Sequence, residues 1–156
     1  MRLYFMEKNR VETAVLKFQS GSNCAQAVLS TYLPAFGIQE SIAHKMGTGL
    51  GAGFGRKQYV CGALNAGAIV LSTLLGNETN DDADRKEVTL ERVHQFINRF
   101  EAKFNSSQCI EIIGIDISTV EGQTKASDAN VFREICDSCV KEVCLQLEEE
   151  LVSKNS

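Results

Sequence analysis

The sequence lacks several features that mark particular classes of protein. It contains no tryptophan and only one proline, Pro34, so a proline-rich linker is excluded. Its 16 Lys and Arg residues are outnumbered by 20 Asp and Glu residues, which gives a net charge of −4, and the basic residues form no cluster. Because nucleic-acid binding depends on basic surfaces that contact phosphates, we expect no nucleic-acid partner.

Long hydrophobic runs are also missing. The longest apolar stretch, Leu64 to Leu75, contains Asn65, Ser72 and Thr73 and is shorter than the roughly 20 residues that a membrane span needs. The first ten residues have neither the apolar core nor the cleavage site of a secretory signal peptide. We therefore expect a cytoplasmic protein without a membrane span, in a compartment where structural disulfides are rare.

Hydrophobic residues recur every three to four positions along most of the chain, which is typical of α-helices that pack by one face. The length of 156 residues and the hydrophobic content of 44% suffice for one domain with a buried core. We predict a single all-α domain over residues 1–156, a bundle of about five to seven helices. Residues 152–156 are expected to form a frayed tail.

The periodicity also predicts where these helices lie. They are expected at residues 11–18, 24–33, 38–46, 61–75, 87–104, 107–113 and 132–151. Asn23 is predicted to cap the second helix, with Gln26 completing a capping box. The helix at 61–75 is apolar on nearly all sides and is expected at the centre of the bundle. Residues 76–86 and 115–130 are expected to be loops.

A glycine-rich loop, Gly47 to Gly55, precedes this central helix and has glycine at every second position. One interpretation is an anion-binding nest of backbone N–H groups. Its residues would be Gly51, Gly53, Gly55 and Arg56, with Lys57 adding charge. The other interpretation, which we favour, is that glycines allow the loop to approach neighbouring helices where a Cβ would clash. The two interpretations are compatible, and no phosphate-loop motif or preceding strand supports the first.

The six cysteines are the main chemical signal. Cys24, Cys61 and Cys109 are each expected near the start of a helix, where unpaired N–H groups and the helix dipole stabilise a thiolate. Thiolates attack disulfides and bind soft metals. The remaining cysteines, Cys136, Cys139 and Cys144, follow one another along the last helix. The opposing interpretation is that these are inert thiols packed in the core, as free cysteines often are.

Two further patterns carry less information. Cys136 and Cys139 form a Cys-x-x-Cys pair, but the preceding strand that a thioredoxin-like fold requires is absent. The two histidines, His44 and His94, are spaced like solvent-facing helix residues, so we do not expect either to be a metal ligand.

The arrangement of cysteine-containing segments resembles the C-GCAxxG-C-C family of redox-active proteins. The four matching blocks are Asn23 to Val28, the glycine loop with Cys61 to Leu64, Cys109 to Asp116, and Cys136 with Val140. The similarity extends over about residues 23–151. Two departures stand out, since Ala66 followed by Gly67 replaces the family's glycine at position 66, and Cys139 and Cys144 are additional to the four-cysteine pattern.

The resemblance implies a small helical protein with redox-active cysteines and no established substrate. Our leading hypothesis is a thiol redox protein in which Cys24, Cys61, Cys109 and Cys136 converge. The nucleophile would be Cys61, exposed by the glycine loop and with its pKa lowered by the helix start, and Cys24 or Cys109 would resolve the intermediate. The redox partner, a protein or a small thiol, stays open, as do enzymatic turnover and homodimer formation.

Two alternatives remain at this point. The same four cysteines would suit a zinc ion or an iron–sulfur cluster, which would make the chain a metal-binding protein. In the last alternative the cysteines are inert and the chain is a non-catalytic helical module.

Overall fold

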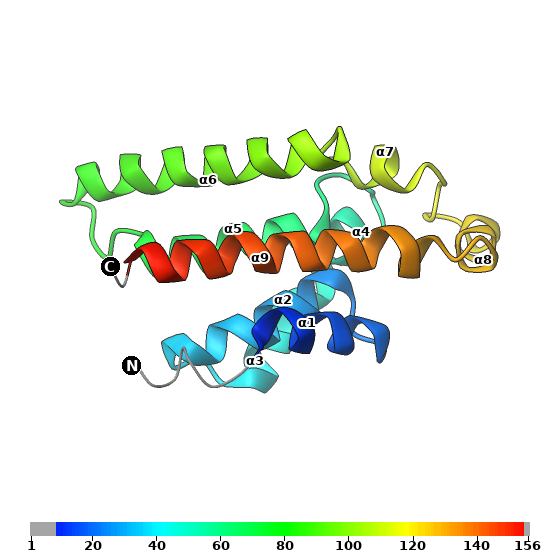
Figure 1. The fold of residues 1–156 in the computed structure, drawn as a ribbon, viewed down its shortest axis with the longest axis horizontal. Coiled ribbons are helices and arrows are strands. Elements are labelled where there is room, and N and C mark those ends of the chain that lie inside the picture. Colours follow the sequence, from blue (N-terminus) through cyan, green and yellow to red (C-terminus); the bar gives the residue numbers. More distant parts are fainter. Residues whose placement is uncertain (1–8, 155–156) are drawn as a thin grey trace.

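The computed structural model describes residues 9–154, which form an all-α fold, as predicted (Figure 1). The α-helices are α1 (Arg10–Gln19), α2 (Cys24–Tyr32), α3 (Glu40–Gly47), α5 (Gly62–Leu75), α6 (Ala83–Phe104), α7 (Cys109–Ile113), α8 (Val120–Asp128) and α9 (Asp137–Lys154). Shorter turns are η1 (Leu33–Phe36), η2 (Thr48–Leu50), the left-handed α4 (Gly51–Phe54) and the π-helical η3 (Phe132–Cys136). Within these residues there is no β-strand and one isolated bridge, between Val60 and Gln108.

Helices α5 and α9 lie side by side at the centre of the bundle, with α6 along one side and α1 to α3 along the other (Figure 1). The central position of α5 confirms the prediction from its all-round hydrophobicity. A Cβ at Gly67 would lie 2.6 Å from Cζ of Phe96 in α6 and 2.8 Å from Cγ1 of Val143 in α9. The close approach of these helices is therefore centred on Gly67, one residue after the buried Ala66.

Three boundaries differ from the prediction. Residues 115–130 are not all loop, because Thr119 accepts a hydrogen bond from Gly122 N–H and starts α8. Only Gly122 and Ala126 of α8 are buried, so the helix leaves little hydrophobic periodicity in the sequence. Helix α6 begins at Ala83, inside the predicted 76–86 loop, since Asp82 caps it. Helix α9 continues through residues 152–154 of the predicted tail, and residues 155–156 lie outside the described part.

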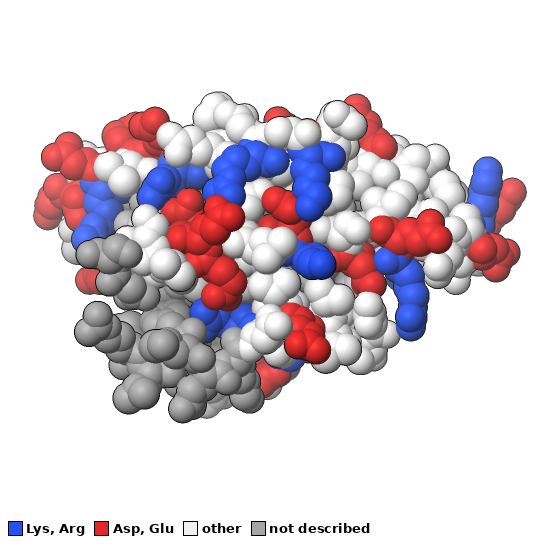
Figure 2. Space-filling view, in the orientation of Figure 1, with Lys and Arg blue, Asp and Glu red and all other residues white. Residues whose placement is uncertain are grey.

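The outer face of α6 is joined to α9 by ion pairs. Lys103 Nζ lies 2.6 Å from Glu142 Oε2, and Arg92 Nε lies 3.4 Å from Glu150 Oε2. On the face drawn in Figure 2, acidic and basic side chains alternate rather than gather into a patch of one sign. Such exposed pairs contribute about 0–1 kcal/mol each. Between residues 9 and 154 no helix is both long and apolar enough to cross a membrane.

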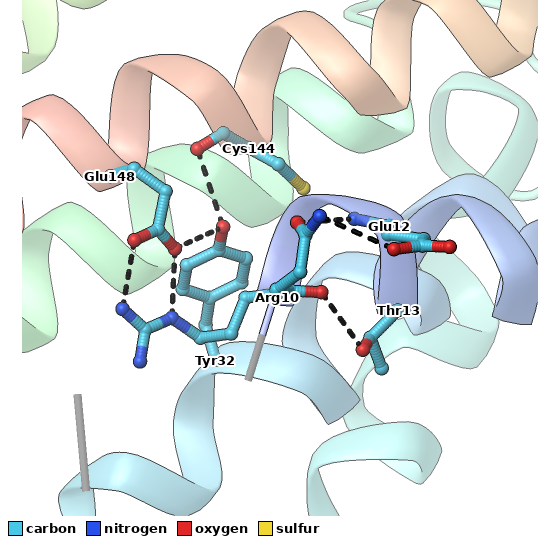
Figure 3. Close-up of polar contacts among 7 residues, drawn as sticks. Arg10, Glu12, Thr13, Tyr32, Cys144 and Glu148 are labelled. Atoms are coloured by element: carbon cyan, nitrogen blue, oxygen red, sulfur yellow. Dashed lines mark hydrogen bonds and ion pairs between the residues drawn. The ribbon is translucent and has the colours of Figure 1, made fainter. Parts of the chain in front are cut away.

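A partly buried polar network ties α1 and α2 to the second half of α9 (Figure 3). Arg10 makes a bidentate ion pair with Glu148, with both N–O distances 2.8 Å. The buried Tyr32 hydroxyl donates to Glu148 Oε1 at 2.8 Å and contacts the backbone oxygen of Cys144 at 3.3 Å. The hydrogen bond and the charge of Glu148 raise the Arg10 pKa. This network holds the second half of α9 against α1 and α2.

Candidate functional site

The start of α2 is held in place by the predicted capping box. Asn23 Oδ1 accepts from Gln26 N–H at 2.8 Å, and Gln26 Oε1 accepts from Asn23 N–H at 3.0 Å. The Asn23 amide also donates to the backbone oxygens of Gly47 and Thr48. These bonds attach α2 to the glycine-rich loop and leave Cys24 as the first residue of the helix.

A short antiparallel bridge brings Cys61 and Cys109 together from distant parts of the sequence. Cys61 N–H donates to the Ser107 oxygen at 2.8 Å, and Cys109 N–H donates to the Tyr59 oxygen at 2.6 Å. Cys61 is the N-cap of α5 and Cys109 is the first residue of α7. The bridge therefore places two helix starts, each with a cysteine, side by side.

Gln58, next to the bridge, is a buried residue that the sequence pattern did not single out. Its side-chain amide donates to the Ile115 oxygen at 2.9 Å and accepts from Ile117 N–H at 2.8 Å. It also forms a hydrogen bond with the Cys109 thiol that lowers the pKa of this group, against the larger effect of burial. A lone glutamine in a polar segment has no periodic signal, so only the tertiary structure reveals its role.

The glycine-rich loop contains a left-handed turn. From Ala52 to Arg56, five consecutive residues have φ between +53° and +66°. Three of them are not glycine, and each such residue costs about 1–2 kcal/mol relative to a right-handed conformation. At Gly53, a Cβ would lie 2.6 Å from Tyr59 N, so this position requires glycine for space as well as for φ. The turn reverses the chain so that it enters the bridge and reaches Cys61.

Close approach explains other glycines around the site. A Cβ at Gly47 would lie 2.6 Å from Gln26 N, and a Cβ at Gly62 would lie 2.6 Å from the Cys24 sulfur. The structure thus supports the interpretation that these glycines allow close packing. An anion-binding role for Gly51, Gly53, Gly55 and Arg56 stays a prediction.

These elements enclose a cavity of about 140 Å³ lined by five of the six cysteines. The lining sulfur residues are Cys24, Cys61, Cys109, Cys136 and Cys139. The cavity lies where the main core meets a smaller hydrophobic cluster built from α7, α8 and η3. All six cysteines are free thiols. The structure thus brings together the four cysteines selected from the sequence and adds Cys139, while Cys144 lies elsewhere.

The cysteines of the cavity differ in how readily they ionise. The Cys61 pKa is lowered by a hydrogen bond with the Cys139 thiol and by the N–H groups of Leu64 and Ala63, against the opposing effect of burial. Burial and the nearby Cys61 charge raise the pKa of Cys24 and of Cys109 to about 12. The hydrogen bond to Cys61 raises the Cys139 pKa. The cavity therefore favours one thiolate, on Cys61, surrounded by protonated thiols.

A family model described as "Putative redox-active protein (C_GCAxxG_C_C)" matches residues 22–150. The chain belongs to this family. Nearly all of the described fold, including every residue of the five-cysteine cavity except Phe18, falls within the match. No curated protein and no solved structure matches the chain. Membership in the C_GCAxxG_C_C family supports a general redox role for this protein.

Two expectations about this C_GCAxxG_C_C protein need correction. The glycine loop does not expose Cys61, whose exposed fraction is 7%, because the glycines let the loop and α2 close over the cavity. The second correction is that only one of the three helix starts, the one at Cys61, favours a thiolate. At Cys24 and Cys109 burial outweighs the helix N–H groups, so the pKa rises rather than falls.

The geometry does not support the metal-binding alternative. Thiolates suit zinc and iron–sulfur clusters chemically. However, within the described chain no three His, Cys, Asp or Glu side chains are grouped so as to hold a metal ion. His44 is exposed and its ring nitrogens lie near Ser22 and Gln26, outside the cavity.

Proposed function

We propose that this C_GCAxxG_C_C protein carries out thiol–disulfide exchange in the cysteine-lined cavity, with Cys61 as the nucleophile. The observation that carries the proposal is the cavity of about 140 Å³ that Cys61 and Cys139 line together, where the Cys139 thiol lowers the Cys61 pKa. A thiolate with an adjacent thiol and free space beside it has what the exchange reaction requires. Cys139 is then the resolving cysteine, in place of Cys24 or Cys109.

The reaction proceeds in two substitutions at sulfur. The Cys61 thiolate attacks one sulfur of a small disulfide R–S–S–R, forming Cys61–S–S–R and releasing R–S⁻. The Cys139 thiol gives its proton to the departing R–S⁻, and its sulfur attacks Cys61 Sγ and releases the second R–S⁻, which takes a proton from solvent. The two cysteines are oxidised by two electrons to a disulfide, and the small disulfide is reduced to two thiols.

The remaining cavity cysteines have a supporting role in this proposal. Cys24 and Cys136 are partly exposed and Cys109 is buried. The thiols of Cys24 and Cys136 stay protonated when Cys61 is charged, because burial raises their pKa and a second negative charge in the same small cavity raises it further. Exchange is thus directed to one nucleophile although five thiols line the space.

The proposal includes a reducing compartment such as the cytoplasm. Exchange that starts from a Cys61 thiolate and a Cys139 thiol needs surroundings that keep these two cysteines reduced. Trapping thiols with an alkylating agent at the moment of cell lysis tests this part. We expect Cys61 and Cys139 to be mostly alkylated, and a predominantly disulfide-bonded population would contradict it.

The catalytic assignment is tested with anaerobically reduced protein and dimethyl disulfide, an uncharged disulfide small enough for the cavity. We expect the wild type to lose two of its six thiols and peptide mass spectrometry to find a Cys61–Cys139 bond. Cys139→Ser should stop at a mixed disulfide on Cys61, and Cys61→Ser should not react in the cavity. Cys144→Ser, a change at a buried thiol of the same helix outside the cavity, should behave as the wild type.

The same experiment has outcomes that contradict the proposal. A wild-type protein whose cysteines do not react under native conditions, but do react after unfolding, contains inert packed thiols. A disulfide between Cys61 and a cysteine other than Cys139 would agree with Cys61 as the nucleophile but would contradict Cys139 as the resolving cysteine.

A further inference from the structure

The walls of the cavity restrict what can enter it. Besides the five cysteines, the lining residues are Phe18, Asn23, Ala52, Gly62, Ile112, Ile113, Ile117 and Phe132. None of these side chains is charged. A substrate that carried carboxylate or ammonium groups into this space would lose its hydration without gaining partners, which is strongly unfavourable.

Hydrogen-bonding capacity is equally scarce. Among the described residues that line the cavity, Asn23 is the only polar one other than cysteine. Its side chain is already hydrogen-bonded to Gln26, Gly47 and Thr48. A peroxide, which both donates and accepts strong hydrogen bonds, therefore finds few partners here. Sulfur is polarisable and hydrogen-bonds weakly, so a small sulfur compound suits walls of sulfur and hydrocarbon.

The volume sets a further limit. A cavity of about 140 Å³ is close in size to an engineered apolar cavity of about 150 Å³ that holds one benzene molecule. A group of a few heavy atoms fits, whereas a tripeptide thiol such as glutathione does not. The substrate class is thus restricted to very small, weakly polar sulfur species.

We infer, building on the proposed thiol–disulfide function, that the cavity accepts hydrogen sulfide and holds its sulfur as a persulfide on Cys61. The reaction starts from the Cys61–Cys139 disulfide. The sulfide sulfur attacks Cys61 Sγ, an S–S bond forms between them, and the Cys61–Cys139 bond breaks with its electron pair on Cys139, which takes up the sulfide proton. The sulfide sulfur rises by one oxidation number and the Cys139 sulfur falls by one, so the disulfide is the only oxidant.

The test begins with protein in which dimethyl disulfide has formed the Cys61–Cys139 bond. Anaerobic sodium sulfide is added, and peptide mass spectrometry after alkylation locates any added sulfur. The same measurement with glutathione provides the size comparison, and both rates are divided by the rate of the same nucleophile with cystamine, an exposed disulfide. We expect sulfur on Cys61 alone and a normalised rate for sulfide at least tenfold above that for glutathione.

A pair of variants tests whether the cavity itself causes this selectivity. Ile112→Phe places a larger side chain in the cavity wall and should slow persulfide formation at least tenfold. Ile110→Phe makes the same substitution at an exposed position of α7 and should have no effect. Circular dichroism confirms that both fold, and Ile113→Phe, at another position of the cavity wall, serves as a second filling variant if Ile112→Phe does not.

The outcomes separate the two proposals. If dimethyl disulfide forms the Cys61–Cys139 bond but glutathione then reacts as fast as sulfide, or sulfur appears on another cysteine, the persulfide inference is wrong and the exchange function stands. If the disulfide never forms, the exchange function fails and the inference fails with it.

Discussion

Cys139 and Cys144 are two buried thiols five residues apart on α9, with exposed fractions of 2% and 0%. Cys139 lines the cavity together with Cys61, and its thiol lowers the Cys61 pKa. Cys144 lies in the filled core, near the Arg10–Tyr32–Glu148 network of Figure 3. The pKa of both thiols is raised. Burial is therefore common to the two cysteines. Cys139 differs from Cys144 in that it lines free space and has a neighbouring thiolate.

The two ends of α9 also differ in packing. The second half of α9 packs against α1 and α2 through buried leucines and the polar network. Its first half follows the π-helical η3, which places Cys136 beside the cavity. A cavity of about 140 Å³ therefore lies beside the start of α9, where Cys136 and Cys139 line it.

The largest expected effect of the buried Cys144 thiol is on alkaline unfolding. Burial raises the pKa of Cys144 to about 12, whereas an unfolded cysteine titrates near 9.0. Between these values the unfolded state has lost a proton that the folded state retains, so the free energy of unfolding falls as pH rises. Cys144→Ala should reduce this slope by about 1.4 kcal/mol per pH unit between pH 9.5 and 11. Urea titrations at several pH values measure it, and an unchanged slope would contradict the buried-thiol assignment.

The alkylation rate of Cys61 should depend on Cys139 and not on Cys144. Removing the thiol that hydrogen-bonds to Cys61 destabilises its thiolate, so Cys139→Ala should slow iodoacetamide alkylation of Cys61 at pH 7 by about tenfold. Cys144→Ala should leave the rate unchanged. Site-resolved mass spectrometry gives both rates, and equal effects of the two variants would show that Cys139 is not a partner of Cys61.

Overpacking at the cavity end should be costly. In Gly62→Ala the new methyl group would lie 2.6 Å from Cys24 Sγ and 2.8 Å from the Leu50 oxygen, and we expect a loss of about 2 kcal/mol of stability. Gly49→Ala is the matched control, since a Cβ there has no neighbour within 4 Å. Thermal unfolding measures both, and a neutral Gly62→Ala would mean that α5 and α2 are less tightly apposed.

In the Arg10–Tyr32–Glu148 network, Tyr32→Phe should lower the stability of the protein without changing the reactivity of Cys61. It removes the hydroxyl that donates to Glu148 and contacts Cys144, and we expect a loss of about 1.5 kcal/mol. The alkylation rate of Cys61 should not change, because the network does not reach the cavity. A changed rate would show that the two ends of α9 are coupled.

The smallest effect concerns the left-handed turn. Arg56→Gly replaces a strained residue at φ +64° with one that adopts this conformation freely, so stability should rise by about 1 kcal/mol. Lys57→Gly, the exposed neighbour without a positive φ, should not be stabilising. Chemical denaturation compares the two, and a destabilised Arg56→Gly would point to contacts of Arg56 that favour its predicted anion-binding role.

Much of this arrangement could be predicted from the sequence. The cap at Asn23, the apolar central helix and the cysteines at helix starts are local patterns, and the structure contains each of them. Gln58 and the bridge could not be predicted, because their partners lie some fifty residues away. Cys139 and Cys144 are indistinguishable by periodicity alone. Their difference depends on the π-helical turn and on which elements face α9, which only tertiary packing decides.

A single stabilised thiolate among five clustered cysteines distinguishes this cavity, and the pH dependence of alkylation tests this most directly. Rates of iodoacetamide modification are measured for each cysteine of the native protein from pH 5 to pH 10. We expect Cys61 to react first, with a midpoint below the ordinary value of 9.0, while Cys24 and Cys109 stay unmodified because burial raises the pKa of each to about 12. A Cys61 midpoint at or above 9.0, or earlier modification of another cysteine in the cavity, would contradict it.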